Sequence, residues 1–111
     1  MPKKASDTLI VFTNLPDRTS AFTLARALVD KRLAACVNVL GEISSVYRWK
    51  GEIADESEVA VLIKTRATAY PALEAAIKAL HPYEIPEIVA VPVAGGLPAY
   101  LDWVAAETSP D

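Results

Sequence analysis

Four segments of the chain carry the apolar pattern of β-strands. Their apolar residues are mostly aliphatic and often β-branched, which favours extended structure. In part of the second segment Ile43, Ser45, Tyr47 and Trp49 alternate with Ser44, Val46, Arg48 and Lys50, and that is the period of a strand. The predicted strands cover residues 8–13, 33–50, 52–63 and 87–93.

The second and third of these strands are expected to form a hairpin. Lys50-Gly51 suits its tight turn, because Gly51 takes a positive φ without steric cost. Gly41-Glu42 interrupts the strand that precedes the turn and predicts a bend or a β-bulge. The hairpin therefore has long arms, one of which is irregular.

Three further segments repeat apolar residues with a helical period and predict helices over residues 18–33, 69–80 and 98–107. Asp17 and Thr68 stand where helix N-caps are expected. The side chains expected to face a core are Ala21, Leu24, Ala25, Leu28 and Val29 in the first helix and Leu73, Ala76, Ile77 and Leu80 in the second.

The resulting order is β-α-β-β-α-β with a C-terminal helix, which predicts an α+β, ferredoxin-like split β-α-β fold. In that fold two helices cover one face of a four-stranded antiparallel sheet. At 111 residues the chain has the length of one domain. We expect a single domain over residues 1–111, with flexible tails at 1–6 and 108–111.

The second face of this sheet needs a cover that one chain does not supply. Residues 9–12, 59–63 and 88–91 are apolar on both faces, as in strands that are covered on both sides. Another subunit is the economical cover. A charge in the third strand, as in Val61→Asp, is expected to prevent assembly or folding.

Composition excludes several classes of protein. Apolar residues make up 52% of the chain, which excludes intrinsic disorder. The net charge of −3 argues against nucleic-acid binding. Cys36 is the only cysteine, so no disulfide forms within the chain, and no apolar run is long enough to cross a bilayer. We expect a cytoplasmic protein without membrane insertion.

The chain contains no catalytic motif, and we expect a protein that is not an enzyme. Cys36 lies in an apolar segment and reads as a buried hydrophobe or as a soft metal ligand. His81 opens the string His81-Pro82-Tyr83-Glu84 and reads as a loop histidine bonded to backbone, or as a metal ligand. A subunit junction would help such a site by adding ligands.

Acidic and aromatic residues supply the other candidates. Glu58 belongs to an acidic run that reads as a solvated hairpin face or as a site for a hard cation. Tyrosine and tryptophan suit interfaces and small-molecule clefts. The candidate metal ligands are His81, Cys36, Glu84 and Glu58, and the candidate interface or ligand-cleft residues are Tyr47, Trp49, Lys64, Tyr83 and Trp103.

Several strings together resemble the CutA-type divalent-cation-tolerance proteins. The match runs over about residues 8–105. Its strings are Leu33-Ala34-Ala35-Cys36-Val37-Asn38, Ser45-Val46-Tyr47-Arg48-Trp49-Lys50-Gly51, Glu58, Lys64-Thr65, His81-Pro82-Tyr83-Glu84-Ile85-Pro86-Glu87 and Tyr100-Leu101-Asp102-Trp103.

The resemblance implies a ferredoxin-like protomer in a tight homotrimer whose long hairpin reaches across subunits. It also implies a cytosolic role in tolerance to copper and other divalent metals, and leaves room for an unidentified protein partner. In family members with a proposed copper site, a cysteine aligns with Thr13 and a second histidine with Leu80. Here only His81 of that set is present, and Cys36 is the remaining thiol.

A second hypothesis comes from another class. A trimeric ferredoxin-like body also resembles PII-type signalling proteins, which bind small anionic ligands in clefts between subunits. Lys64, Arg66 and Arg48 would supply the positive charge for such a ligand.

Overall fold

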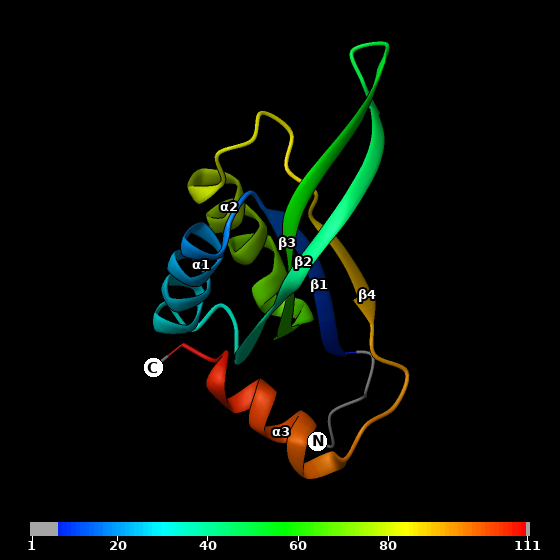
Figure 1. The fold of residues 1–111 in the computed structure, drawn as a ribbon. Coiled ribbons are helices and arrows are strands. Elements are labelled where there is room, and N and C mark those ends of the chain that lie inside the picture. Colours follow the sequence, from blue (N-terminus) through cyan, green and yellow to red (C-terminus); the bar gives the residue numbers. More distant parts are fainter. Residues whose placement is uncertain (1–6, 111) are drawn as a thin grey trace.

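A four-stranded sheet with helices packed against it makes up residues 7–110, the part of the chain that the computed structural model describes (Figure 1). The strands are β1 (Thr8–Leu15), β2 (Cys36–Trp49), β3 (Glu52–Arg66) and β4 (Val89–Pro92). The helices are α1 (Arg18–Asp30), α2 (Tyr70–Leu80), which a 3-10 turn (Ala67–Ala69) precedes, and α3 (Pro98–Glu107).

The sheet has the order β2-β3-β1-β4, and every neighbouring pair in it is antiparallel. Helix α1 joins β1 to β2, and α2 joins β3 to β4, so each connection passes over a strand of the other unit. This is the interleaved split β-α-β order. The predicted α+β fold with an antiparallel sheet is confirmed.

The β2–β3 hairpin extends well beyond the rest of the protein (Figure 1). Its turn places Lys50 at φ 49° and Gly51 at φ 82°, the two positive φ values that suit a tight hairpin. The register shifts between Val39 and Glu42, which confirms the predicted bulge. Because of the hairpin, the protomer measures 50 Å in its longest direction against 26 and 23 Å in the others.

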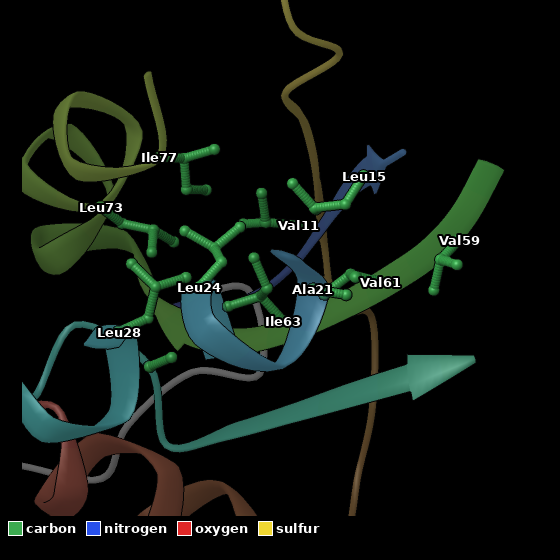
Figure 2. Close-up of a cluster of buried hydrophobic side chains, with 11 residues drawn as sticks. Val11, Leu15, Ala21, Leu24, Leu28, Val59, Val61, Ile63, Leu73 and Ile77 are labelled. Carbon is green, nitrogen blue, oxygen red and sulfur yellow. The ribbon is translucent and has the colours of Figure 1, made fainter. Parts of the chain in front are cut away.

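Helices α1 and α2 lie side by side on one face of the sheet and enclose the core with it (Figures 1 and 2). Alternate residues of β1 and β3 point into this layer. Val61, only 1% exposed, is one of them. The core consists of Val11, Leu15, Ala21, Leu24, Leu28, Ala34, Val59, Val61, Ile63, Leu73 and Ile77.

Two side chains predicted to face the core lie outside it. Val29 is 44% exposed, because it lies on the side of α1 that lines a groove beside β2. Leu80 is 47% exposed as the last residue of α2, where the helix ends. The prediction that Val29 and Leu80 face the core is therefore wrong, and each lies at the margin of the apolar side of its helix.

The ends of several elements differ from the prediction. Helix α1 stops at Asp30, because Arg32 takes a φ of 58° and the next amides bond back to the carbonyl of Leu28. Asp17 caps α1 as predicted, accepting a 2.7 Å bond from the Ser20 amide. Thr68 does not cap α2, because it lies inside the preceding 3-10 turn.

The second face of the sheet keeps apolar side chains exposed in the protomer. Phe12 is 36% exposed, between Leu62 of β3 and Val89 of β4 in the register. Val89 and Val91 are 52% and 40% exposed. The inference that one chain leaves an apolar sheet face thus holds for the described protomer. Val61 points away from that face, so a charge at that position tests the core, and Phe12 tests the second face.

The C-terminal segment packs against the body of the protein. Thr108 is buried, and its hydroxyl donates to the carbonyl of Val104 at 2.7 Å. The Arg32 guanidinium donates to the carbonyls of Ala106 and Ser109 at 2.8 and 2.6 Å. These contacts anchor a segment that the sequence places in a flexible tail. The other predicted tail, residues 1–6, lies outside the described residues, as does residue 111. None of the described helices is long and apolar enough to span a bilayer.

Candidate functional site

His81 anchors the loop between α2 and β4. Its Nε2 lies 2.6 Å from the carbonyl oxygen of Asn14, and its Nδ1 accepts a 3.2 Å bond from the Tyr83 amide. A carbonyl only accepts hydrogen bonds, so Nε2 carries the proton and the lone pair of Nδ1 points to the amide. Of the two hypotheses for His81, the arrangement matches the loop histidine bonded to backbone. A metal ion at Nδ1 would have to replace the Tyr83 amide.

The rest of this loop, residues 82–88, runs beside the hairpin (Figure 1). Glu87 accepts a 3.3 Å bond from the Asn14 amide group. Glu84 lies 3.7 Å from the Lys50 ammonium at the hairpin turn, in an exposed ion pair. Pro82 and Pro86 restrict the backbone between these contacts. The loop is therefore tied to β1 at its two ends and to the tip of the hairpin in its middle.

Tyr83 connects this loop to the base of the hairpin. Its ring lies 4.7 Å from the His81 ring, tilted by 52°. Burial raises the pKa of Tyr83 to about 12, and the charge and hydrogen bonding of Glu58 contribute. The Glu58 carboxylate belongs to a residue that is only 7% exposed. A nearly buried acid thus has a phenol as its neighbour.

Tyr47 and Glu56 extend the same arrangement along the hairpin. The Tyr47 hydroxyl donates a hydrogen bond to Glu56, which raises the pKa of Tyr47, with burial and the charges of Glu56 and Glu58 adding to it. Both glutamates also raise the pKa of Tyr83. We call Tyr47, Glu56, Glu58 and Tyr83 the tyrosine–glutamate cluster. It concentrates negative charge and two phenols where the hairpin leaves the sheet.

The raised pKa of Tyr83 predicts a loss of stability at high pH. The folded pKa of about 12 exceeds the ordinary value of 10.0, so between these values the unfolded chain releases the proton and the folded chain keeps it. The free energy of unfolding therefore falls as pH rises from 10 towards 12. Urea unfolding of the wild type at pH 9 and pH 11 measures this loss. Tyr83→Phe is expected to show a smaller loss, since the other tyrosines are common to both proteins. An equal loss would contradict the assignment to Tyr83.

Cys36 and Lys64 lie at a different part of the sheet. They are opposite each other in the β2–β3 register, whereas Glu58 is opposite Ile43. Lys64 is six positions from Glu58 along β3, roughly 20 Å of strand. The Lys64 ammonium donates to the Asn38 side-chain oxygen at 2.5 Å. Cys36 is half-buried and free.

Tyr100 of α3 comes close to Cys36 from another element. Burial raises the pKa of Tyr100, and the charge and hydrogen bonding of Cys36 add to it. The Trp103 ring lies 5.6 Å from the Tyr100 ring. Trp49 is far from both, at the hairpin turn, with the Lys50 ammonium 5.6 Å from its ring.

The predicted site residues are thus divided among three places. His81, Glu58, Tyr83 and Tyr47 come together at the base of the hairpin. Cys36, Lys64 and Trp103 lie near the start of β2 and α3, and Glu84 and Trp49 lie near the hairpin turn. Within residues 7–110, one chain contains no group of three or more His, Cys, Asp and Glu side chains able to hold a metal ion.

Three residues with central contacts escape the sequence analysis as site residues. Asn14 accepts from His81 across 67 positions of sequence, and Tyr100 meets Cys36 across 64. No local pattern signals either pair. Asn38 had a usable signal, because it stands two positions after Cys36 and so shares its face of the strand.

Comparison with known proteins identifies the family. The family described as CutA1 divalent ion tolerance protein matches residues 9–107. A divalent-cation tolerance protein CutA of Thermus thermophilus is 48% identical over 99 residues, covering 89% of this chain and 96% of that protein. The human protein CutA is 46% identical over 97 residues, and this chain spans only 54% of its length.

Solved structures agree with this result. A divalent cation tolerance protein of Thermus thermophilus has a TM-score of 0.90 at 46% identity, with 92% of this chain and 99% of that chain covered. A CutA of Xylella fastidiosa has a TM-score of 0.91 at 45% identity, with 94% and 100% covered. The chain with the His81 loop and the long hairpin therefore belongs to the CutA1 divalent ion tolerance family.

Proposed function

We propose that this protein acts in tolerance to divalent metal ions such as copper, as a homotrimer that binds the ions weakly at its subunit boundaries. The observation that carries the proposal is the family membership over residues 9–107. Its relatives are described as divalent-cation tolerance proteins. We propose a binding role without catalysis.

Two features of the protomer support assembly with further copies. The second sheet face leaves Phe12, Val89 and Val91 exposed, and burying such side chains contributes about 25 cal/mol for each Å². The sheet order also leaves β2 and β4 as its two edge strands. An unpaired strand edge offers backbone groups to another strand. A closed ring of copies would cover both the face and the edges, because each copy brings one edge of each kind.

The metal ions are proposed to bind at the base of the hairpin. Glu56 and Glu58 supply carboxylates there, and His81 supplies Nδ1 if the Tyr83 amide yields its bond. These donors are too few for a site within one chain, as the described residues show. Donors from a neighbouring copy, reached by its hairpin, would complete the site. Cys36 and Glu84 lie apart from this place and contribute least.

Copper titration of the metal-free protein tests the proposal. Cu(II) is expected to raise the melting temperature, because a ligand that binds only the folded state stabilises it by mass action. His81→Ala and Glu58→Gln are each expected to reduce the rise, while Glu107→Gln, at the end of α3, leaves it unchanged.

Calorimetry supplies the contrary outcome. If copper, zinc and cadmium show no heat of binding at millimolar concentration, metal binding is wrong. If binding occurs but His81→Ala and Glu58→Gln both bind as tightly as the wild type, the ions bind elsewhere. Light scattering measures the molar mass of each variant. A variant that no longer assembles is then not mistaken for one that has lost a metal ligand.

We propose a cytoplasmic location. The single free cysteine supports it, because disulfides are rare in that compartment. Among the relatives, one is described as chloroplastic and one solved structure as periplasmic. Fractionation of cells that produce the protein, followed by detection of the chain in each fraction, tests the location.

A further inference from the structure

Two cations, Lys64 and Arg66, stand side by side on the second face of the sheet. Lys64 and Arg66 are two positions apart on β3, so both side chains leave the strand on the same side. Both are half-buried. Among residues 7–110 the structure shows no carboxylate paired with either of them, and their hydrogen bonds go to neutral oxygens of Asn38 and Thr108.

This arrangement leaves donors unused. The Lys64 ammonium has three hydrogens and gives one to the Asn38 side chain. The Arg66 guanidinium has five and gives the one on Nε to the Thr108 carbonyl at 3.2 Å. The two terminal nitrogens of Arg66 and two hydrogens of Lys64 remain for another partner.

Further polar groups surround the two cations. The Cys36 thiol lies opposite Lys64 in the β2–β3 register, and the Tyr100 hydroxyl of α3 lies beside that thiol. On the other side Ile10 is opposite Lys64. A thiol, a phenol, an ammonium and a guanidinium from three elements thus gather on this face. We call Cys36, Lys64, Arg66 and Tyr100 the cationic cluster.

Electrostatics indicates what this cluster lacks. Two like charges whose Cα atoms are roughly 7 Å apart repel each other. Partial burial adds a cost to each charge unless it is paired. If a second copy covers this face, the cost rises further, because more water leaves. An anion with two negative charges would neutralise both cations and accept the unused hydrogens.

We propose that the cationic cluster binds a small oxyanion, such as a phosphate group. Arg66 contacts two of its oxygens through its terminal nitrogens, in the fork geometry that guanidinium groups use for phosphate. Lys64 contacts a third oxygen, held in place by Asn38. Tyr100 and Cys36 line the side of the site and donate to the remaining oxygen. This site is separate from the proposed metal site, since roughly 20 Å of β3 lies between them.

Calorimetric titration with inorganic phosphate at constant ionic strength tests this proposal on the assembled wild-type protein. Lys64→Met is expected to weaken binding at least tenfold, because a hydrogen bond to a charged group contributes about 1.5–3 kcal/mol. Arg66→Lys keeps the charge but loses the fork and is expected to weaken binding several-fold. Lys78→Met, which removes a lysine from α2, is the matched control and is expected to bind as the wild type does.

The reactivity of Cys36 supplies an independent measurement. Bound phosphate is expected to slow alkylation of this thiol by iodoacetamide, whereas chloride at the same ionic strength leaves the rate unchanged. This readout keeps the test decisive if Lys64→Met fails to fold, since it uses the wild type. Tyr100→Phe, which removes a single hydroxyl, gives a milder variant for both measurements.

Three outcomes would overturn the proposal. The first is no phosphate binding up to about 20 mM together with an unchanged alkylation rate. The second is a loss of phosphate affinity in Lys78→Met as large as the loss in Lys64→Met. The third is wild-type phosphate affinity in both Lys64→Met and Arg66→Lys. Glycerol phosphate is titrated in parallel. Tighter binding than inorganic phosphate would support the site and show that its oxyanion belongs to an organic phosphate. Failure here and success of copper binding, or the reverse, separates this site from the metal proposal.

Discussion

Val61→Asp is expected to abolish folding of the protomer at 25 °C. Val61 is 1% exposed in the layer between the sheet and the two helices α1 and α2. A carboxylate placed there has no partner, and burying an unpaired charge costs more than about 4 kcal/mol. That loss approaches the total free energy of unfolding of a small domain, about 5–15 kcal/mol. Far-UV circular dichroism and urea unfolding measure the result.

Ala60→Asp is the control for this variant. Ala60 is the preceding residue of the same strand, half-buried and opposite Asn14, and its side chain points to the second face. It is expected to leave the protomer folded. A cooperative urea transition of Val61→Asp with wild-type midpoint would show that the layer around Val61 tolerates a charge and would contradict the core assignment.

Phe12→Glu is expected to separate the assembly into folded single chains. Phe12 is 36% exposed on the second face, where contact with another copy would bury it. A glutamate at this position is solvated in the protomer and would lose that solvation in an interface. The substitution therefore weakens association of the copies and leaves the folding of the protomer nearly unchanged. Light scattering on a size-exclusion column is expected to give a molar mass of three times 11.9 kDa for the wild type and of 11.9 kDa for the variant.

Phe22→Glu controls for exposure alone. Phe22 is 43% exposed on α1, away from the second face, and its replacement is expected to leave the mass unchanged. A wild type that elutes as a folded single chain would contradict the trimer. A trimeric Phe12→Glu would show that the second face is not the interface, and the edge strands would then be the surfaces to test.

The sequence alone predicts most of the fold, because the local signals agree with one another. The hairpin turn needs two residues with positive φ, and Lys50-Gly51 stands between the two strand patterns. The bulge follows from Gly41 in the middle of a strand pattern. The sidedness of β3 does not follow in the same way. Its residues are apolar on both faces, so only the packed structure shows that Val61 faces the helices and Leu62 the second face.

The candidate site is harder to predict, because its contacts join residues that are distant in sequence. The string that begins at His81 indicates a loop that carries functional side chains. The structure shows that the His81 imidazole is hydrogen-bonded to the Asn14 carbonyl at the end of β1. Glu58 reads as one member of a solvated acidic run until Tyr83 covers it. Single residues with two plausible roles need the spatial neighbours to decide between them.

The extra residue in β2 joins two stretches of the hairpin whose registers differ by one position. Before the bulge Val39 is opposite Val61, and after it Glu42 is opposite Val59. Over this stretch β2 advances three positions while β3 advances two. The parity of β2 is therefore inverted for the rest of its length. Past the bulge the register places Tyr47 opposite Ala54, and so on the same side of the hairpin as Glu56 and Glu58. Deleting Gly41 would let the two registers follow one another without a shift, so Tyr47 would stay opposite Ala54 while β2 lost its local bend.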